Sequence, residues 1–199
     1  MPAAIIPKDE VLDRLAQAFR ENGYDGASIA RLSEATGLGK ASLYHYFKGG
    51  KQEMAAAVLG HVGGRFGKMV IAPLRGTGQP ARRLRAMSDG LNDFYSQGRS
   101  SCILDLFGIG QAGELFRPQL KGAIHRFKNA LGDLLREAGL DQTDAETKAE
   151  DAIVALQGAL VVSRATGDRS VFHRVLEELP SILPGNVKPD TDAPASVGA

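Results

Sequence analysis

The chain has 199 residues, which suits one domain or two small ones, and its 43% hydrophobic and 24% charged residues are typical of soluble globular proteins. The net charge of +1 excludes a strongly basic protein, so any surface that binds nucleic acid must be a local one. No apolar run is long enough to span a bilayer and no signal-peptide pattern is present, so we expect a cytoplasmic protein with no membrane partner.

Cysteine and histidine usage does not indicate a metal centre. With one cysteine, Cys102, neither an intrachain disulfide nor a cysteine-based metal cluster can form. The four histidines are scattered without ligand spacing, and the sequence contains no nucleophile elbow and no glycine-rich phosphate loop. We therefore expect no metal, no cofactor and no enzymatic activity.

The first predicted helix spans residues 8–22 and follows a short, loose arm of residues 1–7. Its apolar residues recur at the spacing of an amphipathic helix that packs on one side, namely Val11, Leu12, Leu15, Ala16 and Phe19. Gly23 is well placed to end this helix.

Residues 28–51 are predicted to form a helix, a tight turn and a second helix. Ser28 is a good N-cap for the first helix, and Gly37 can adopt the left-handed conformation that ends it. In the second helix, residues 40–47, Leu43 and Phe47 lie four residues apart and face inward together. This arrangement is typical of a helix-turn-helix, whose second helix enters the major groove of DNA.

The outward face of residues 40–47 has the chemistry that DNA binding requires. No aspartate or glutamate occurs between Lys40 and Gly50, and lysines can neutralise phosphates while small and hydroxyl side chains reach base edges. An alternative is that the aromatic residues are core residues; we favour it for Phe47 but assign Tyr44 to DNA, because Tyr44 shares a face with Lys40 and Lys48. The predicted DNA-binding residues are Ser28, Lys40, Ala41, Ser42, Tyr44, His45, Tyr46, Lys48 and Lys51.

The run SIARLSEATGLGKASLYHYFKGGKQEM, residues 28–54, resembles the helix-turn-helix of the TetR/AcrR family of transcriptional regulators. The resemblance lies in the GLGKASLYHYF core, the basic turn after it and the Lys-x-x-Met start of the next helix, and it covers roughly residues 8–60. It implies a dimer formed through the last helices, and a small-molecule pocket between the middle helices whose occupation releases the DNA.

We divide the chain at residue 50, with a helix-turn-helix domain in residues 1–50 and a helical ligand-binding and dimerisation domain in residues 51–184. A linking helix, 51–70, carries several glycines, which favour close packing or a weak point in an element that must tilt. A proline-rich break at 73–80 is followed by predicted helices at 81–97, 103–110, 115–138, 144–166 and 168–183. No strand pattern appears, so we predict an all-α fold, and the tail 185–199 is predicted to be disordered.

Aromatic residues and methionines at helical spacing in the middle helices are usually core residues, but as a group they can build an apolar pocket for a small effector. His125 and Tyr95 are its best polar candidates. The residues predicted to line it are Phe66, Met87, Leu91, Phe94, Tyr95, Cys102, Phe107, Phe116, His125 and Phe127.

The last two helices carry a broad apolar surface that requires a partner. They could pack only on their own domain, or they could form a four-helix bundle with a second copy of the chain. We favour the homodimer, because one short recognition helix reads too few base pairs and a two-fold dimer presents two. The predicted interface residues are Ala152, Ile153, Leu156, Ala159, Leu160, Phe172, Val175, Leu176 and Leu179.

The sequence therefore predicts a dimeric repressor that binds palindromic operator DNA and is released by a small, largely apolar ligand. Two alternatives are kept. Cys102 follows Arg99, so a cation near the thiol could make it a redox or electrophile sensor. The chain could also be a helical interaction protein without a ligand, although this leaves the acid-free face of residues 40–50 unexplained.

Overall fold

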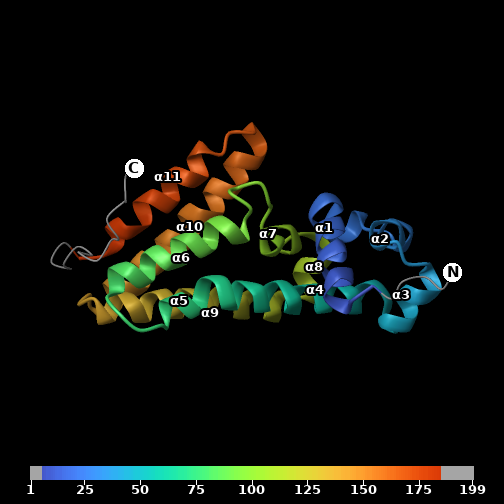
Figure 1. The fold of residues 1–199 in the computed structure, drawn as a ribbon, viewed down its shortest axis with the longest axis horizontal. Helices are drawn as coiled ribbons and strands as arrows, with labels where there is room; N and C mark the ends of the chain where they lie inside the picture. The colour runs from blue at the N-terminus through green and yellow to red at the C-terminus, as the bar shows by residue number, and fades with distance from the viewer. Residues whose placement is uncertain (1–5, 185–199) are drawn as a thin grey trace, which may run out of the picture. The chain divides into compact units, whose positions relative to one another are not determined.

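The computed structural model describes residues 6–184, and every regular element in that range is a helix (Figure 1). The prediction of an all-α fold is confirmed. None of the described helices is both long enough and apolar enough to cross a membrane. The predicted disordered tail, 185–199, lies outside the described residues, as does most of the predicted N-terminal arm.

The chain divides into two compact units, and the division does not fall at residue 50. Unit 1 contains the residues up to Phe66 together with Arg99–His125, and unit 2 contains Gly67–Gly98 together with the residues from Arg126 onward. The linking helix therefore belongs mostly to unit 1, and so does a segment from the middle of the chain. Sequence alone does not reveal this, because the division depends on contacts between residues far apart in the chain.

Unit 1 is built on α1 (Lys8–Gly26), which packs against α2 (Ile29–Thr36), α4 (Gly50–Phe66), α7 (Ile103–Phe107) and α8 (Gly110–Leu115). The short α3 (Lys40–Tyr46) packs on α2. The apolar stripe predicted for the first helix is buried, with Val11, Leu15 and Phe19 fully inaccessible to solvent. At Gly23, the predicted end of that helix, the backbone leaves helical geometry with φ of 65°, and one further helical turn follows.

Unit 2 contains a π-helical turn (Gly67–Ile71), α5 (Ala72–Leu74), α6 (Pro80–Phe94), α10 (Gln142–Thr166), α11 (Ser170–Glu178) and a 3₁₀ turn (Leu179–Ile182). The remaining helix, α9 (Arg117–Glu137), begins in unit 1 and ends in unit 2. Within unit 2, α6 packs on the π-helical turn and on α5, and α11 packs on both α6 and α10. Gly90 of α6 lies against the backbone of the π-helical turn, where an added methyl group would overlap the carbonyl oxygen of Met69.

The residues predicted for the dimer interface lie instead in the interior of unit 2. Those of α10 are at most 7% exposed, Leu176 and Leu179 are also buried, Phe172 is inaccessible to solvent and Val175 is half-buried. The opposite face of α10 is the exposed one, since Val154, Val161 and Val162 expose 65%, 41% and 43% of their surface. The prediction chose the inward face because α10 is apolar on both sides, so that spacing cannot distinguish them.

Candidate nucleic-acid interface

The helix-turn-helix forms through local signals in residues 28–39. Ser28 has extended backbone geometry and its Oγ accepts from Arg31 N at 3.3 Å, which confirms it as the N-cap of α2. Gly37 follows α2 in the left-handed conformation with φ of 71°, as predicted. Gly39 stands at the N-cap of α3 in extended geometry but, having no side chain, leaves the first amides of α3 without a side-chain cap.

Three side chains hold the turn between α2 and α3. Arg14 of α1 donates from Nη1 to the carbonyl oxygen of Thr36, the last residue of α2, at 2.8 Å. Ser33 Oγ donates to the Leu38 carbonyl at 2.5 Å, and Leu38 N donates to Thr36 Oγ1 at 3.3 Å. These bonds satisfy backbone groups that a helix end leaves unpaired. Sequence reasoning missed Arg14, because its partner is 22 residues away.

The recognition helix α3 has one buried and one exposed face. Leu43 is inaccessible to solvent and Phe47, just after the helix, is 1% exposed, so both are core residues as predicted. Among the other predicted residues between 40 and 48, only Tyr46 is half-buried. The exposed set is Lys40, Ala41, Ser42, Tyr44, His45 and Lys48.

Tyr44 is exposed and lies beside the start of α4. It is 47% exposed, and its ring lies against Gly50 at the start of α4, where an added methyl group would be 3.3 Å from Tyr44 Cε1. Gly50 also has a positive φ of 65°, which disfavours any larger residue. The ring therefore lies beside the start of α4, and much of its surface stays open to a ligand.

Lys51, in the first turn of α4, is held by α1. Its ammonium donates to the Tyr24 carbonyl oxygen at 3.1 Å and lies 4.4 Å from the centroid of the Tyr24 ring. Burial raises the pKa of the Tyr24 phenol above its ordinary value, and the negative charge of Asp25 raises it further. The phenol therefore stays neutral; the Tyr24 ring is the cation–π partner of Lys51, and the Tyr24 backbone carbonyl is its hydrogen-bond acceptor.

Glu53, the first acidic residue after α3 in the chain, is hydrogen-bonded to the backbone. Glu53 Oε2 accepts from Gly49 N at 2.6 Å, which ties the carboxylate to the turn between α3 and α4. Between Lys40 and Gly50 there is no acidic residue. A phosphate approaching α3 therefore meets cations and hydroxyl groups with little opposing charge.

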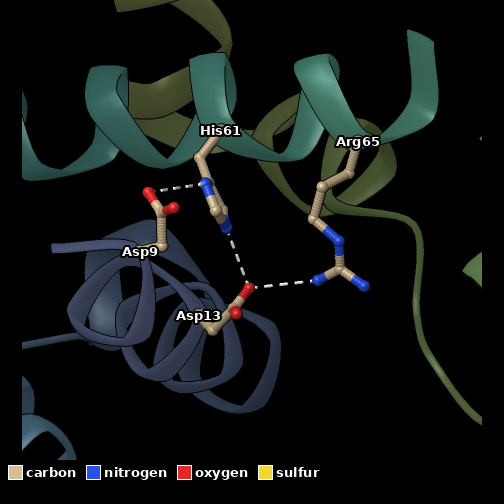
Figure 2. A network of polar contacts seen from close by, with 4 residues as sticks. All are labelled: Asp9, Asp13, His61 and Arg65. Carbon is tan, nitrogen blue, oxygen red and sulfur yellow. Dashed lines mark hydrogen bonds and ion pairs between the residues drawn. The ribbon is translucent and has the colours of Figure 1, made fainter. Parts of the chain in front are cut away.

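A polar network on α1 and α4 holds these two helices together (Figure 2). His61 Nε2 lies 2.9 Å from Asp13 Oδ1, and its Nδ1 lies 4.0 Å from Asp9 Oδ1. Arg65 Nη1 donates to the same Asp13 oxygen at 3.0 Å. The network supports the angle at which α4 leaves the helix-turn-helix. Sequence reasoning saw only scattered histidines, because His61 and Asp13 are 48 residues apart.

The residues predicted for an effector pocket fall in both units. In unit 1, Cys102, Phe107 and Phe116 are buried, Phe66 is half-buried and His125 is exposed. In unit 2, the buried residues are Met87, Leu91, Tyr95 and Phe127, and Phe94 is half-buried. Cys102 is only 4% exposed, which disfavours its use as a sensor of oxidants or electrophiles.

Phe107 and Phe116 belong to an aromatic cluster on α1. Phe107 meets Phe19 and Tyr24 edge to face at centroid distances of 5.4 and 5.9 Å, and Phe116 meets Tyr24 at 5.7 Å. They are therefore core residues of unit 1 and pack behind the helix-turn-helix. Their helical spacing could not show this, since the same spacing fits a pocket wall.

Two family models match the chain. Residues 11–58 match the model described as bacterial regulatory proteins of the tetR family. Residues 80–178 match the model described as the C-terminal domain of LmrA/YxaF-like transcriptional regulators.

The curated proteins and solved structures that are similar to this chain are also transcriptional regulators. The HTH-type transcriptional regulator LmrA of Bacillus subtilis (strain 168) is 18% identical over 185 residues, which cover 88% of this chain and 96% of LmrA. The HTH-type transcriptional repressor AcnR of Corynebacterium efficiens is 37% identical over 51 residues, 26% of this chain and 27% of AcnR. A cysteine mutant of the TetR family regulator CifR, solved with 26bp double-strand operator DNA, has a TM-score of 0.75 at 23% identity over 92% of this chain and 100% of that one. At this identity the likeness shows a shared fold.

Proposed function

Because the chain belongs to the TetR family of bacterial DNA-binding transcriptional regulators, we propose that it is a repressor that binds palindromic operator DNA as a homodimer and is released by a small, largely apolar ligand. Proteins of this family are regulators and not enzymes. The observation that carries the proposal is the exposed face of α3, which presents cations and hydroxyls without an acid and rests on a buried Leu43. A repressor acts by occupying a promoter and blocking the polymerase.

In this proposal α3 lies in the major groove. Lys40 and Lys48 bind phosphates on either side of the groove, and the Tyr44 hydroxyl donates to a phosphate oxygen. Ala41 and Ser42 are small enough for the helix to approach base edges closely. Ser28, His45, Tyr46 and Lys51 complete the proposed contact set. The Ser28 oxygen already accepts from Arg31 N, so its hydroxyl proton remains available to a phosphate.

The exposed face of α10 supports the proposed homodimer. Val154, Gly158, Val161 and Ala165 recur at helical spacing along that face, and Val162 lies beside them. A row of exposed valines with glycine and alanine between them lets two helices approach closely, and it leaves apolar surface in water unless a partner covers it. A second copy that pairs α10 and α11 across a two-fold axis would cover it and place two α3 helices on successive half-sites.

The proposed ligand binds in the helical part of the chain that follows the helix-turn-helix. Two buried side-chain oxygens of unit 2, Asn92 Oδ1 and Ser163 Oγ, have no hydrogen-bond partner among the described residues. Buried polar atoms are usually paired, so these two are candidates for contacts with a ligand or with water. The ligand acts by binding the DNA-competent and DNA-incompetent states with different affinities.

The test is binding of the purified full-length protein to fluorescently labelled duplexes, both from the DNA upstream of its gene and from selection out of a random pool. Anisotropy should report tight binding to a palindrome, with an affinity that falls steeply as salt is raised. Selection that recovers no preferred sequence would overturn the proposal. Sedimentation velocity of the same samples would report a dimer, and a monomer that binds one half-site would refute that part.

A further inference from the structure

The segment Arg99–His125 is part of unit 1, although the residues before and after it in the chain belong to unit 2. Its helices α7 and α8 pack on α1 (Figure 1). The proposed function assigns no role to this contact. Because α1 also packs against α2 and α4, a contact on α1 can affect the DNA-binding surface from inside unit 1.

Two hydrogen bonds link the segment around α7 and α8 to the second half of α1. The Gln111 amide donates to Asp25 Oδ2 at 3.4 Å, and Arg20 Nε donates to the Ser101 carbonyl at 3.3 Å. Gly110 has a positive φ of 59°, and a methyl group there would overlap the Asp25 carboxylate. The α7–α8 segment and the end of α1 are therefore closely fitted to each other.

Tyr24 is the residue where these contacts meet. Its side chain is 5% exposed, and three rings surround it: Phe19 stacked at 6.1 Å, with Phe107 and Phe116 edge to face. Edge-to-face pairs hold a ring in one orientation, because the positive edge of one ring faces the negative face of the other. Two of the three rings come from the segment 99–125, so that segment sets the position of the Tyr24 ring.

The Tyr24 ring in turn holds Lys51. The Lys51 ammonium lies 4.4 Å from the ring centroid and donates to the carbonyl of the same residue. One of its three N–H donors is used by that carbonyl, which leaves two for a phosphate. A lysine held in this way loses less side-chain freedom when it binds DNA than a lysine that is free in solvent.

We propose that Tyr24 is a positioning residue for DNA binding, which holds the Lys51 ammonium at the start of α4 and is itself held by Phe107 and Phe116. The inference rests on the proposed function, in which Lys51 binds a phosphate. It adds a route inside unit 1 by which the segment 99–125 changes DNA affinity without touching DNA.

The experiment is a double-mutant cycle in the full-length protein, measured by anisotropy on the selected operator. Tyr24→Leu removes the ring and is expected to weaken binding about tenfold in the parent protein but less than about twofold in a Lys51→Met background, since coupled residues give non-additive effects. Tyr24→Phe keeps the ring and the carbonyl and should bind within about twofold of the parent. Phe107→Leu, which does not change Lys51 or its direct partner, should weaken binding in the same direction by a smaller factor.

A second measurement separates positioning from loss of folding. In NMR spectra of the protein without DNA, the ε-methylene protons of Lys51 should be shifted upfield by the Tyr24 ring, and Tyr24→Leu should remove the shift. Leu84→Ala is the control: Leu84 of α6 is inaccessible to solvent in unit 2 and lies outside the helices of the proposed dimer contact. It should lower the melting temperature while leaving the operator affinity of the folded protein and the Lys51 shift unchanged.

The outcomes distinguish the two proposals. If Tyr24→Leu weakens DNA binding equally with Lys51 and with Met at position 51, or if the Lys51 protons show no upfield shift, the positioning role is wrong and the proposed function stands. If the parent protein has no preferred DNA sequence, the proposed function itself fails.

Discussion

The two exposed helix faces with proposed macromolecular partners, on α3 and on α10, differ in nearly every property. The α3 face carries lysines and hydroxyls around a small alanine, while the α10 face carries valines, glycine and alanine. The α3 face attracts a polyanion, and salt weakens that attraction by restoring counterions. The α10 face gains from removal of water, so salt has little effect on it. The comparison shows that charge, more than exposure, identifies the kind of partner.

The sharpest test of the comparison is charge reversal on α3. Lys40→Glu removes the proposed phosphate contact from each protomer of the proposed dimer and adds repulsion, so operator affinity should fall by about 100-fold, roughly tenfold for each half-site. The slope of log affinity against log salt should also become less steep. Lys40→Met, which removes the charge without adding an acid, should have a smaller effect. Anisotropy across a salt series measures both, and the dimer should persist in both variants.

A charge placed on the α10 face should weaken the dimer, which the α3 variants are expected to leave intact. Val161→Glu puts a carboxylate into the proposed apolar contact and should raise the dimer dissociation constant by roughly tenfold or more, because an unpaired buried charge is costly. Sedimentation velocity at several concentrations measures the change. The control is Ala86→Glu on the exposed side of α6, which adds the same carboxylate outside the proposed contact and should leave the dimer unchanged. A Val161→Glu protein that stays fully dimeric would show that another face makes the contact.

Gly90 of α6 tests a region that belongs to neither surface. Gly90→Ala places a methyl group where the Met69 carbonyl oxygen lies, so α6 and the π-helical turn must move apart. Overpacking of this kind costs about 1–3 kcal/mol of unfolding free energy. Urea denaturation followed by circular dichroism should detect it. Gly64→Ala on α4, where an added methyl group meets nothing within 4 Å, is the matched substitution and should not destabilise the protein, because alanine favours a helix interior over glycine.

The smallest expected effect is a pH dependence at the start of α11. The amide and hydroxyl of Ser170 donate to the Asp168 carboxylate at 2.8 and 2.9 Å, and they hold the pKa of that carboxyl below its ordinary value. Because the folded-state pKa is lowered, the stabilisation is complete above the unfolded-state pKa and is lost as pH falls through the folded-state pKa. Asp168→Asn should therefore be less stable than the parent at about pH 7, with the difference shrinking at about pH 3. A difference that stays constant across this range would contradict the assignment.

The helix-turn-helix could be predicted because its signals are local. The Ser28 cap, the left-handed Gly37 and the inward pair of Leu43 and Phe47 each depend on a few neighbouring residues. Long-range partners could not be predicted in this way. Arg14 binds the turn between α2 and α3, and His61 meets Asp13, through contacts that no spacing rule contains.

The two ambiguities about apolar residues have one cause. The inward residues of α10 and the aromatic pair Phe107 and Phe116 were recognised as apolar and helical, but periodicity does not say what a helix face packs against. Leu156 packs inside unit 2, and Phe107 packs on α1. Only the fold distinguishes a core face from an interface or from a pocket wall.

Unit 1 is made of two separate stretches of sequence, which limits how its DNA-binding part can be joined to another regulator. Exchange of DNA-binding modules between regulators usually assumes that the N-terminal part can be moved as one continuous piece. Here a piece that stops at Phe66 leaves behind the rings of Phe107 and Phe116, and with them the apolar cover of Phe19 and Tyr24. A hybrid with a foreign second half must restore that cover, so the two halves of this chain are constrained to change together.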